Sequence, residues 1–186
     1  MYIDITTKIT PEMIKDAQGN EKKSLVGHMG THFDVMDKEF PLEYLSRKAV
    51  MFDVREVKER DIELSDIPSD KIEKNMFVLF YSGFIDTEEY GSKEYFQRHP
   101  QLSDELIDFL VQKEVSIIGI DFAGVRRERE HTPKDQYLAD RNIFVIENLC
   151  NLGSLLEKQY SDFKVNTYPV NYAGMTGLPC RVVAEC

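Results

Sequence analysis

The second half of the chain alternates short apolar runs with helical patterns, and this alternation constrains the fold more than any other feature. Met76–Tyr81, Val115–Asp121 and Ile143–Ile146 have the length and the β-branched or aromatic content of buried strands. Ser103 is a good N-cap for a helix between the first two runs, and a shorter helix is expected over Pro133–Ala139. This strand–helix–strand–helix–strand order predicts right-handed crossovers and parallel strand pairing.

The first half shows strand patterns with turns between them. Tyr2–Thr6 alternates and is expected to open a strand that ends near Pro11, and Ala49–Asp53 is a further buried strand. Leu25–Phe33 is expected to form strand and turn, because its glycines would weaken a helix. We expect this half to be a β-meander. Since no repeat or linker divides the chain, residues 1–186 are predicted to fold as a single α/β domain with a mixed β-sheet and flanking helices.

Composition excludes several classes of partner. The net charge of -10 argues against a nucleic-acid partner, because phosphate binding draws on clustered Lys and Arg. No run reaches the roughly 18 apolar residues that span a bilayer. The first residues lack the pattern of a secretion signal. The three cysteines include no short-spaced pair, which favours a reducing compartment. A cytoplasmic protein without a membrane partner is expected.

One short stretch, GHMGTHFDVMDKEF at 27–40, concentrates metal-binding side chains in a chain that has 4 histidines. In an extended segment, His28, His32 and Asp34 share a parity and would project from one face. Two imidazoles and a carboxylate are suitable ligands for Zn²⁺ or Mn²⁺, and positions left open for water would make such a site catalytic. Histidines that make ordinary hydrogen bonds in a loop are the alternative.

The same stretch resembles a family signature. HMGTHFD, at His28–Asp34, resembles the HxGTHxD motif of the cyclase family that includes bacterial kynurenine formamidases and isatin hydrolases. Tyr95–Ser103 resembles the family's segment before its helix, and Ile118–Asp121 resembles its central strand. Val145–Leu152 and Gly177–Arg181 also have counterparts. The resemblance therefore extends, in order, over nearly the whole chain.

The resemblance implies a fold, a reaction and partners. The fold would be of the cyclase type, related to swivelling β/β/α domains. A divalent metal ion, Zn or Mn, would polarise an amide carbonyl and lower the pKa of bound water. The substrate would be a small amide or lactam, and the protein would form a homodimer. Carried over by position, His28, His32 and Asp34 would be ligands of the metal.

Glu147 corresponds to a late glutamate ligand of the family. It ends the apolar run Ile143–Ile146, where a buried glutamate is unusual unless it is paired or bound to metal. A solvated side chain at the end of a strand is the alternative.

The chain departs from the family where the general acid/base is expected. Kynurenine formamidases read A-P-x-H after the aspartate, whereas this chain reads Val-Met-Asp-Lys at 35–38. Lys38 could act as a catalytic base only if its surroundings lowered its pKa by several units. A solvated loop lysine is the alternative.

A second departure lies twelve positions before Glu147, where the family places a histidine ligand and this chain has Asp135. In one interpretation Asp135 binds the metal through oxygen, and His131 serves as a general base or an extra ligand. In the other, Thr132 caps a helix that has Pro133 in its first turn, and Asp135 completes the capping arrangement. The sequence leaves both open.

The leading hypothesis is a metal-dependent hydrolase of a cyclic or N-acyl amide, similar to arylformamidases. The alternative is a divergent member of the family that binds a small ligand without catalysis, because Lys38 stands where the family has its histidine. A third hypothesis is that Lys38 and His131 support a different hydrolytic or elimination reaction. No motif reports the identity of the substrate.

Overall fold

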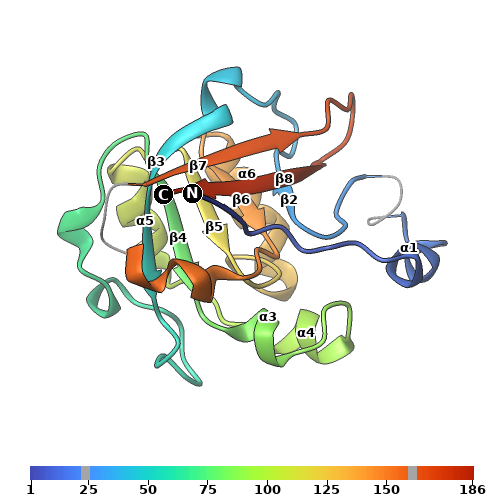
Figure 1. Cartoon of the computed structure of the whole chain (residues 1–186), viewed down its shortest axis with the longest axis horizontal. Coiled ribbons are helices and arrows are strands. Elements are labelled where there is room, and N and C mark those ends of the chain that lie inside the picture. The colour runs from blue at the N-terminus through green and yellow to red at the C-terminus, as the bar shows by residue number, and fades with distance from the viewer. Residues whose placement is uncertain (22–25, 159–162) are drawn as a thin grey trace.

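The strands form one sheet that closes on itself, as Figure 1 shows for the computed structural model, which describes residues 1–21, 26–158 and 163–186. In chain order the strands are β1 (Tyr2–Asp4), β2 (His32–Asp34), β3 (Ser46–Asp53), β4 (Phe77–Tyr81), β5 (Ile117–Ile120), β6 (Phe144–Glu147), β7 (Phe163–Pro169) and β8 (Gly177–Glu185). Neighbours follow the order β8-β2-β6-β5-β4-β3-β7, and β7 also pairs with β8. These described strands therefore make a closed seven-stranded barrel.

The long strand β8 makes this closure. It pairs with β7 from Cys180 to Glu185, with β2 near its own start, and with β1 near its end. The pairing of β1 brings the two termini side by side (Figure 1), where the Met1 ammonium donates a hydrogen bond to the Cys186 carbonyl. A barrel leaves few open strand edges, which limits edge-to-edge association.

Strands β3, β4, β5 and β6 pair in parallel, and β2 joins β6 and β8 in antiparallel fashion. The predicted mixed sheet with parallel pairing in the second half is confirmed. The predicted β-meander is wrong, because β1 and β2 take their partners from β6 and β8 and make no described pairing with each other or with β3. Their connections are far longer than the two to five residues typical of hairpins.

Helices lie outside the barrel at its ends and on one side (Figure 1). They are α1 (Pro11–Ala17), α3 (Phe84–Thr87), α4 (Lys93–Arg98), α5 (Asp104–Gln112) and α6 (His131–Ala139). The predicted cap of α5 is confirmed, since the Leu106 amide donates to Ser103 Oγ at 3.1 Å. The opening strand is shorter than predicted, because β1 ends at Asp4 and Pro11 begins α1 behind a Thr10 cap.

Two apolar clusters explain why the strands of the second half are apolar without interruption. Phe77 and Leu79 of β4 belong to a cluster that draws residues from β2 to β8 and therefore fills the barrel. The alternate residues Val78 and Phe80 belong to a second cluster shared with α5 and α6. Both faces of these strands are buried, as is typical of parallel sheets covered by helices. None of the described helices has the length and apolar character required to cross a membrane.

Candidate metal centre

The register between two strands brings a histidine and a glutamate together. β2 runs antiparallel to β6, and His32 lies directly opposite Glu147. The Nε2 atom of His32 lies 3.6 Å from Oε2 of Glu147 and 3.6 Å from Oδ1 of Asp34. All three side chains are buried. Residues that are far apart in the sequence thus meet at one end of the barrel.

His28 reaches the same place from a turn. Of the strand and turn predicted over Leu25–Phe33, the strand is limited to the residues from His32 onward, and Leu25 lies outside the described residues. Nδ1 of His28 lies 3.0 Å from Oδ1 of Asp34 and 3.1 Å from Nε2 of His32, and its Nε2 lies 2.8 Å from Oγ1 of Thr176. A shared strand face is therefore not what unites the motif, because the turn carries His28 to the cluster.

The ring of His32 is oriented by the turn that precedes it. Its Nδ1 lies 2.8 Å from the carbonyl oxygen of Gly30, which also accepts a hydrogen bond from Nδ2 of Asn148 at 3.0 Å. Because a carbonyl only accepts, Nδ1 carries a proton, and Nε2 is the nitrogen that faces the cluster. Gly30 has a φ of 64°, and an added Cβ would lie 2.3 Å from Cδ1 of Ile9. The turn therefore requires glycine.

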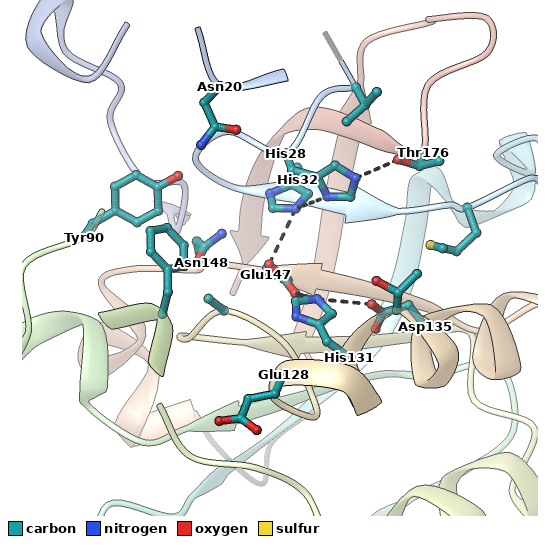
Figure 2. Close-up of a pocket in the computed structure, with 15 residues that line it drawn as sticks. Asn20, His28, His32, Tyr90, Glu128, His131, Asp135, Glu147, Asn148 and Thr176 are labelled. Atoms are coloured by element: carbon teal, nitrogen blue, oxygen red, sulfur yellow. Dashed lines mark hydrogen bonds and ion pairs between the residues drawn. The ribbon is translucent and has the colours of Figure 1, made fainter. Parts of the chain in front are cut away.

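Helix α6 supplies the remaining side chains. His131 and Asp135 lie one turn apart, with Nε2 of His131 at 3.2 Å from Oδ2 of Asp135 and 3.1 Å from Oε1 of Glu147. The alternative in which Thr132 caps the helix is wrong, since α6 begins at His131 and its N-cap residue, Glu130, makes no side-chain capping hydrogen bond. Asp135 is instead 3 % exposed and turned toward the cluster. Figure 2 shows His131 between Glu147 and Asp135.

Several carboxylate oxygens of this cluster lack hydrogen bonds. Both oxygens of Asp34, Oδ1 of Asp135 and Oε1 of Glu147 are buried and receive no hydrogen bond from any described residue. An imidazole nitrogen lies close to two of them, but without the alignment of a hydrogen bond. Buried carboxylates without partners are costly. Such a set of nitrogen and oxygen donors fits a divalent cation.

The donor atoms form two overlapping groups. His28, His32 and Asp34 place ligand atoms within 4.8 Å of one another, and so do Asp34, His131 and Asp135. Asp34 belongs to both groups. The structure thus brings together His28, His32, Asp34, Asp135 and Glu147, the residues that the sequence singled out as metal ligands, with His131 beside them.

The carboxylates attract positive charge. Burial lowers the pKa of His131, but the carboxylates of Asp135 and Glu147 outweigh this effect and raise it to about 11. The pKa of His32 is likewise lowered by burial and raised by Asp34 and Glu147, to about 9. Burial, together with the charge of Asp34, raises the pKa of Asp135. Without an ion, the cluster retains protons that a divalent cation would replace.

A cavity of about 410 Å³ opens over the cluster. Figure 2 shows most of its walls, which are formed by Asn20, Val26, His28, His32, Met36, Tyr90, Phe96, Ala123, Glu128, His131, Thr132, Asp135, Glu147, Asn148 and Thr176. Tyr90, Phe96 and Asn148 were missed by sequence reasoning. The aromatic residues Phe33 and Phe80 are fully buried and do not line this cavity. The one available signal for Tyr90 and Phe96 was their place in an otherwise polar segment.

Lys38 does not reach the cavity. Its ammonium lies 2.7 Å from Oδ1 of Asp140 and 3.0 Å from Oδ1 of Asp37, at the surface. Hydrogen bonds to Asp140 and Asp37 raise the pKa of Lys38. A catalytic base would need the opposite shift. The expectation that Lys38 serves as a base therefore has no support in the geometry, because its ammonium is paired with Asp140, which follows α6, and with the neighbouring Asp37.

The chain belongs to the family described as Putative cyclase, whose model matches residues 3–126. This match includes His28, His32 and Asp34, whereas His131, Asp135 and Glu147 lie beyond it. The three-dimensional cluster connects the two sets. Comparison with curated proteins gives no match.

Solved structures share the fold over nearly the full length. A structure described as a potential metal-dependent hydrolase with cyclase activity has a TM-score of 0.75 and 24% identity, covering 99% of this chain and 96% of that chain. Isatin hydrolase A from Labrenzia aggregata has a TM-score of 0.75 and 18% identity, covering 99% and 93%. A structure described as a predicted metal-dependent hydrolase from Bacillus stearothermophilus has a TM-score of 0.72 and 22% identity, covering 99% and 97%. The predicted fold class is confirmed.

Proposed function

We propose that the protein is a metal-dependent hydrolase that cleaves a cyclic or N-acyl amide. One observation carries the proposal: four carboxylate oxygens without hydrogen bonds lie beside three histidines at the base of a cavity. Family membership and the hydrolase names of the structural neighbours support it. An amide or lactam of modest size fits a cavity of about 410 Å³.

His28, His32, Asp34, Asp135 and Glu147 would hold the ion, Zn or Mn. Once bound, a divalent ion supplies a Lewis acid for the carbonyl and lowers the pKa of water. The chain's own residues orient the ring of His32 through Gly30 and keep the acidic cluster buried.

His131 would move the proton. Its Nε2 lies within 3.2 Å of both Asp135 and Glu147, so a proton at this atom is held at the edge of the cluster. The carboxylates that raise its pKa are also ligands for the ion. With a divalent cation bound, the charge of these carboxylates would be neutralised and their pull on the proton would decrease. His131 thereby becomes able to accept and return a proton near neutral pH.

A metal and activity assay tests the proposal. Purified protein supplemented with zinc or manganese should retain near-stoichiometric metal and melt at a lower temperature after EDTA treatment. It should hydrolyse a member of a panel of N-formylkynurenine, isatin, simple lactams and lactones, and His32→Ala should abolish turnover. Protein that stays metal-free and melts unchanged with EDTA contradicts the proposal. Stabilisation by a panel ligand without turnover indicates the alternative, a non-catalytic binding protein. The homodimer and the cytoplasmic location stay predictions.

A further inference from the structure

Tyr90 forms the wall of the cavity opposite α6. It lies in the segment between α3 and α4, and Figure 2 shows it across the cavity from Asp135. Its ring packs edge-on against Tyr95 at a centroid distance of 5.4 Å and against Phe96 at 6.3 Å. These contacts hold the ring in place, so the position of its hydroxyl is determined before any ligand enters.

Among the described residues, the Tyr90 hydroxyl accepts a hydrogen bond but does not donate one. The amide of Gly30 donates a hydrogen bond to this oxygen at 2.7 Å. No residue in the described part of the chain accepts the phenolic hydrogen. A tyrosine hydroxyl both donates and accepts, and accepting one bond strengthens its capacity to donate another. A donor is therefore left for the contents of the cavity.

The phenol keeps this hydrogen at neutral pH. Burial raises the pKa of Tyr90, and the nearby charge of Glu147 adds to the effect. The hydroxyl is therefore neutral, and its unused function is that of a donor rather than an acceptor or a nucleophile.

The ligand group that accepts the hydrogen bond from Tyr90 must differ from the ligand group that lies against the metal-binding residues. The hydroxyl oxygen of Tyr90 accepts a hydrogen bond from the amide of Gly30, and the carbonyl oxygen of Gly30 accepts one from Nδ1 of His32. The cluster lies at the other nitrogen, Nε2. One imidazole therefore separates the phenol from the cluster, and a small ligand that spans this separation needs two acceptors.

We propose that Tyr90 donates a hydrogen bond to a second acceptor of the substrate, next to the carbonyl that is cleaved. The inference rests on the proposed function and narrows its substrate class to small amides or lactams that carry an additional carbonyl or equivalent acceptor. Tyr90 is a specificity-determining residue in this scheme. A simple lactam with one carbonyl has no second acceptor for the hydrogen bond from Tyr90 and should bind more weakly.

A ligand pair tests this directly. Isatin has a ketone beside its lactam carbonyl, and oxindole is the same lactam without the ketone. Dissociation constants for both are measured on the metal-loaded protein by rapid-mixing fluorescence, before turnover. Tyr90→Phe should weaken isatin binding about tenfold, as expected for one hydrogen bond, and oxindole binding less than about twofold. Tyr81→Phe is the matched control, because its hydroxyl donates to Oδ2 of Asp86 at 2.9 Å and lies outside this cavity.

Metal content and melting temperature of Tyr90→Phe separate recognition from support of the Gly30 turn. A variant that loses metal or weakens both ligands equally shows a structural role and overturns the proposal. Equal affinities of the wild type for the two ligands, or no binding of either, overturn it as well. The proposed function is tested separately, by hydrolysis of the substrate panel named above. Turnover of the panel without a selective effect of Tyr90→Phe supports the proposed function and overturns this inference. Selective binding without turnover contradicts the proposed function and supports only the hydrogen bond from Tyr90 to a second acceptor of the ligand.

Discussion

Nε2 of His131 lies 3.2 Å from Oδ2 of Asp135, one turn further along α6. Asp135 occupies the position at which the resemblance predicted a histidine ligand, and His131 carries an imidazole to the same place from the preceding turn. Residues four apart lie on one face of a helix. The site therefore still has an imidazole nitrogen, from His131, and has gained the carboxylate of Asp135. We assign ligand binding to Asp135 and proton transfer to His131.

His131→Asn should separate these roles. An amide cannot carry a proton between substrate and solvent, so kcat should fall by about a hundredfold or more, while bound metal stays near the wild-type level. Metal analysis and steady-state kinetics on the same preparation provide the measurement. Loss of the metal together with activity would show instead that His131 is a ligand.

Gly124→Ala should disturb the site through His131. Gly124 has a φ of 113°, and an added Cβ would lie 2.8 Å from Cε1 of His131 and 2.8 Å from the carbonyl oxygen of Arg126. Gly174→Ala is the matched control, since Gly174 has a φ of 73° with open space around it. Both substitutions should lower the melting temperature through backbone strain. We expect only Gly124→Ala to lower kcat as well, and equal activity losses in the two variants would refute the role of this contact.

Lys38→Met should leave kcat within about twofold of the wild type. The Lys38 ammonium is held at the surface by Asp140 and Asp37 and does not line the cavity. Exposed ion pairs contribute little to stability, so the melting temperature should change little. Kinetics with the best substrate of the panel are sufficient. A hundredfold decrease in kcat would restore Lys38 as a candidate base.

His99 should make the protein less stable in acid. Burial lowers the pKa of His99 to about 4, and the positive neighbours His131 and Arg127 add to this shift. Between about pH 6.5 and pH 4 the unfolded chain binds the proton more readily, so stability decreases as the pH falls through this range, by up to about 3 kcal/mol. Denaturant unfolding of wild type and His99→Asn, at several values of pH, measures this difference.

The free energy of unfolding of His99→Asn should decrease less steeply below pH 6.5 than that of the wild type, after the difference between the two proteins at pH 7.5 is subtracted. Asparagine can retain a donor for the Pro100 carbonyl, which lies 2.7 Å from Nδ1 of His99. Parallel profiles for the two proteins would exclude His99 as the source of acid sensitivity.

Local sequence patterns predicted the strands and helices of the second half. Each of β4, β5 and β6 is buried on both faces, which imposes a continuous apolar run that can be recognised in a single sequence. Closure of the barrel was not predictable in this way, because β8 pairs with strands from the opposite end of the chain. Pairing over such separations depends on the whole fold.

Some residues of the site could be predicted from the sequence and others could not. His28, His32 and Asp34 were found from spacing and residue type, and Glu147 from the resemblance and its place after an apolar run. The roles of Asp135 and Thr132 could not be decided, because capping and ligation suit the same sequence until the first residue of α6 is known. Tyr90 could not be assigned to the site from the sequence, since its hydrogen bond to Gly30 joins two loops 60 residues apart.

Anomalous diffraction from crystals grown with zinc or manganese tests the central claim most directly. We expect a peak within about 2.0–2.2 Å of Nε2 of His32 and a carboxylate oxygen of Asp34, with Asp135 or Glu147 completing the coordination. Lys38 should remain on Asp140, away from the ion. A fully loaded crystal in which the peak lies elsewhere, or in which the cluster binds no ion, would contradict the account.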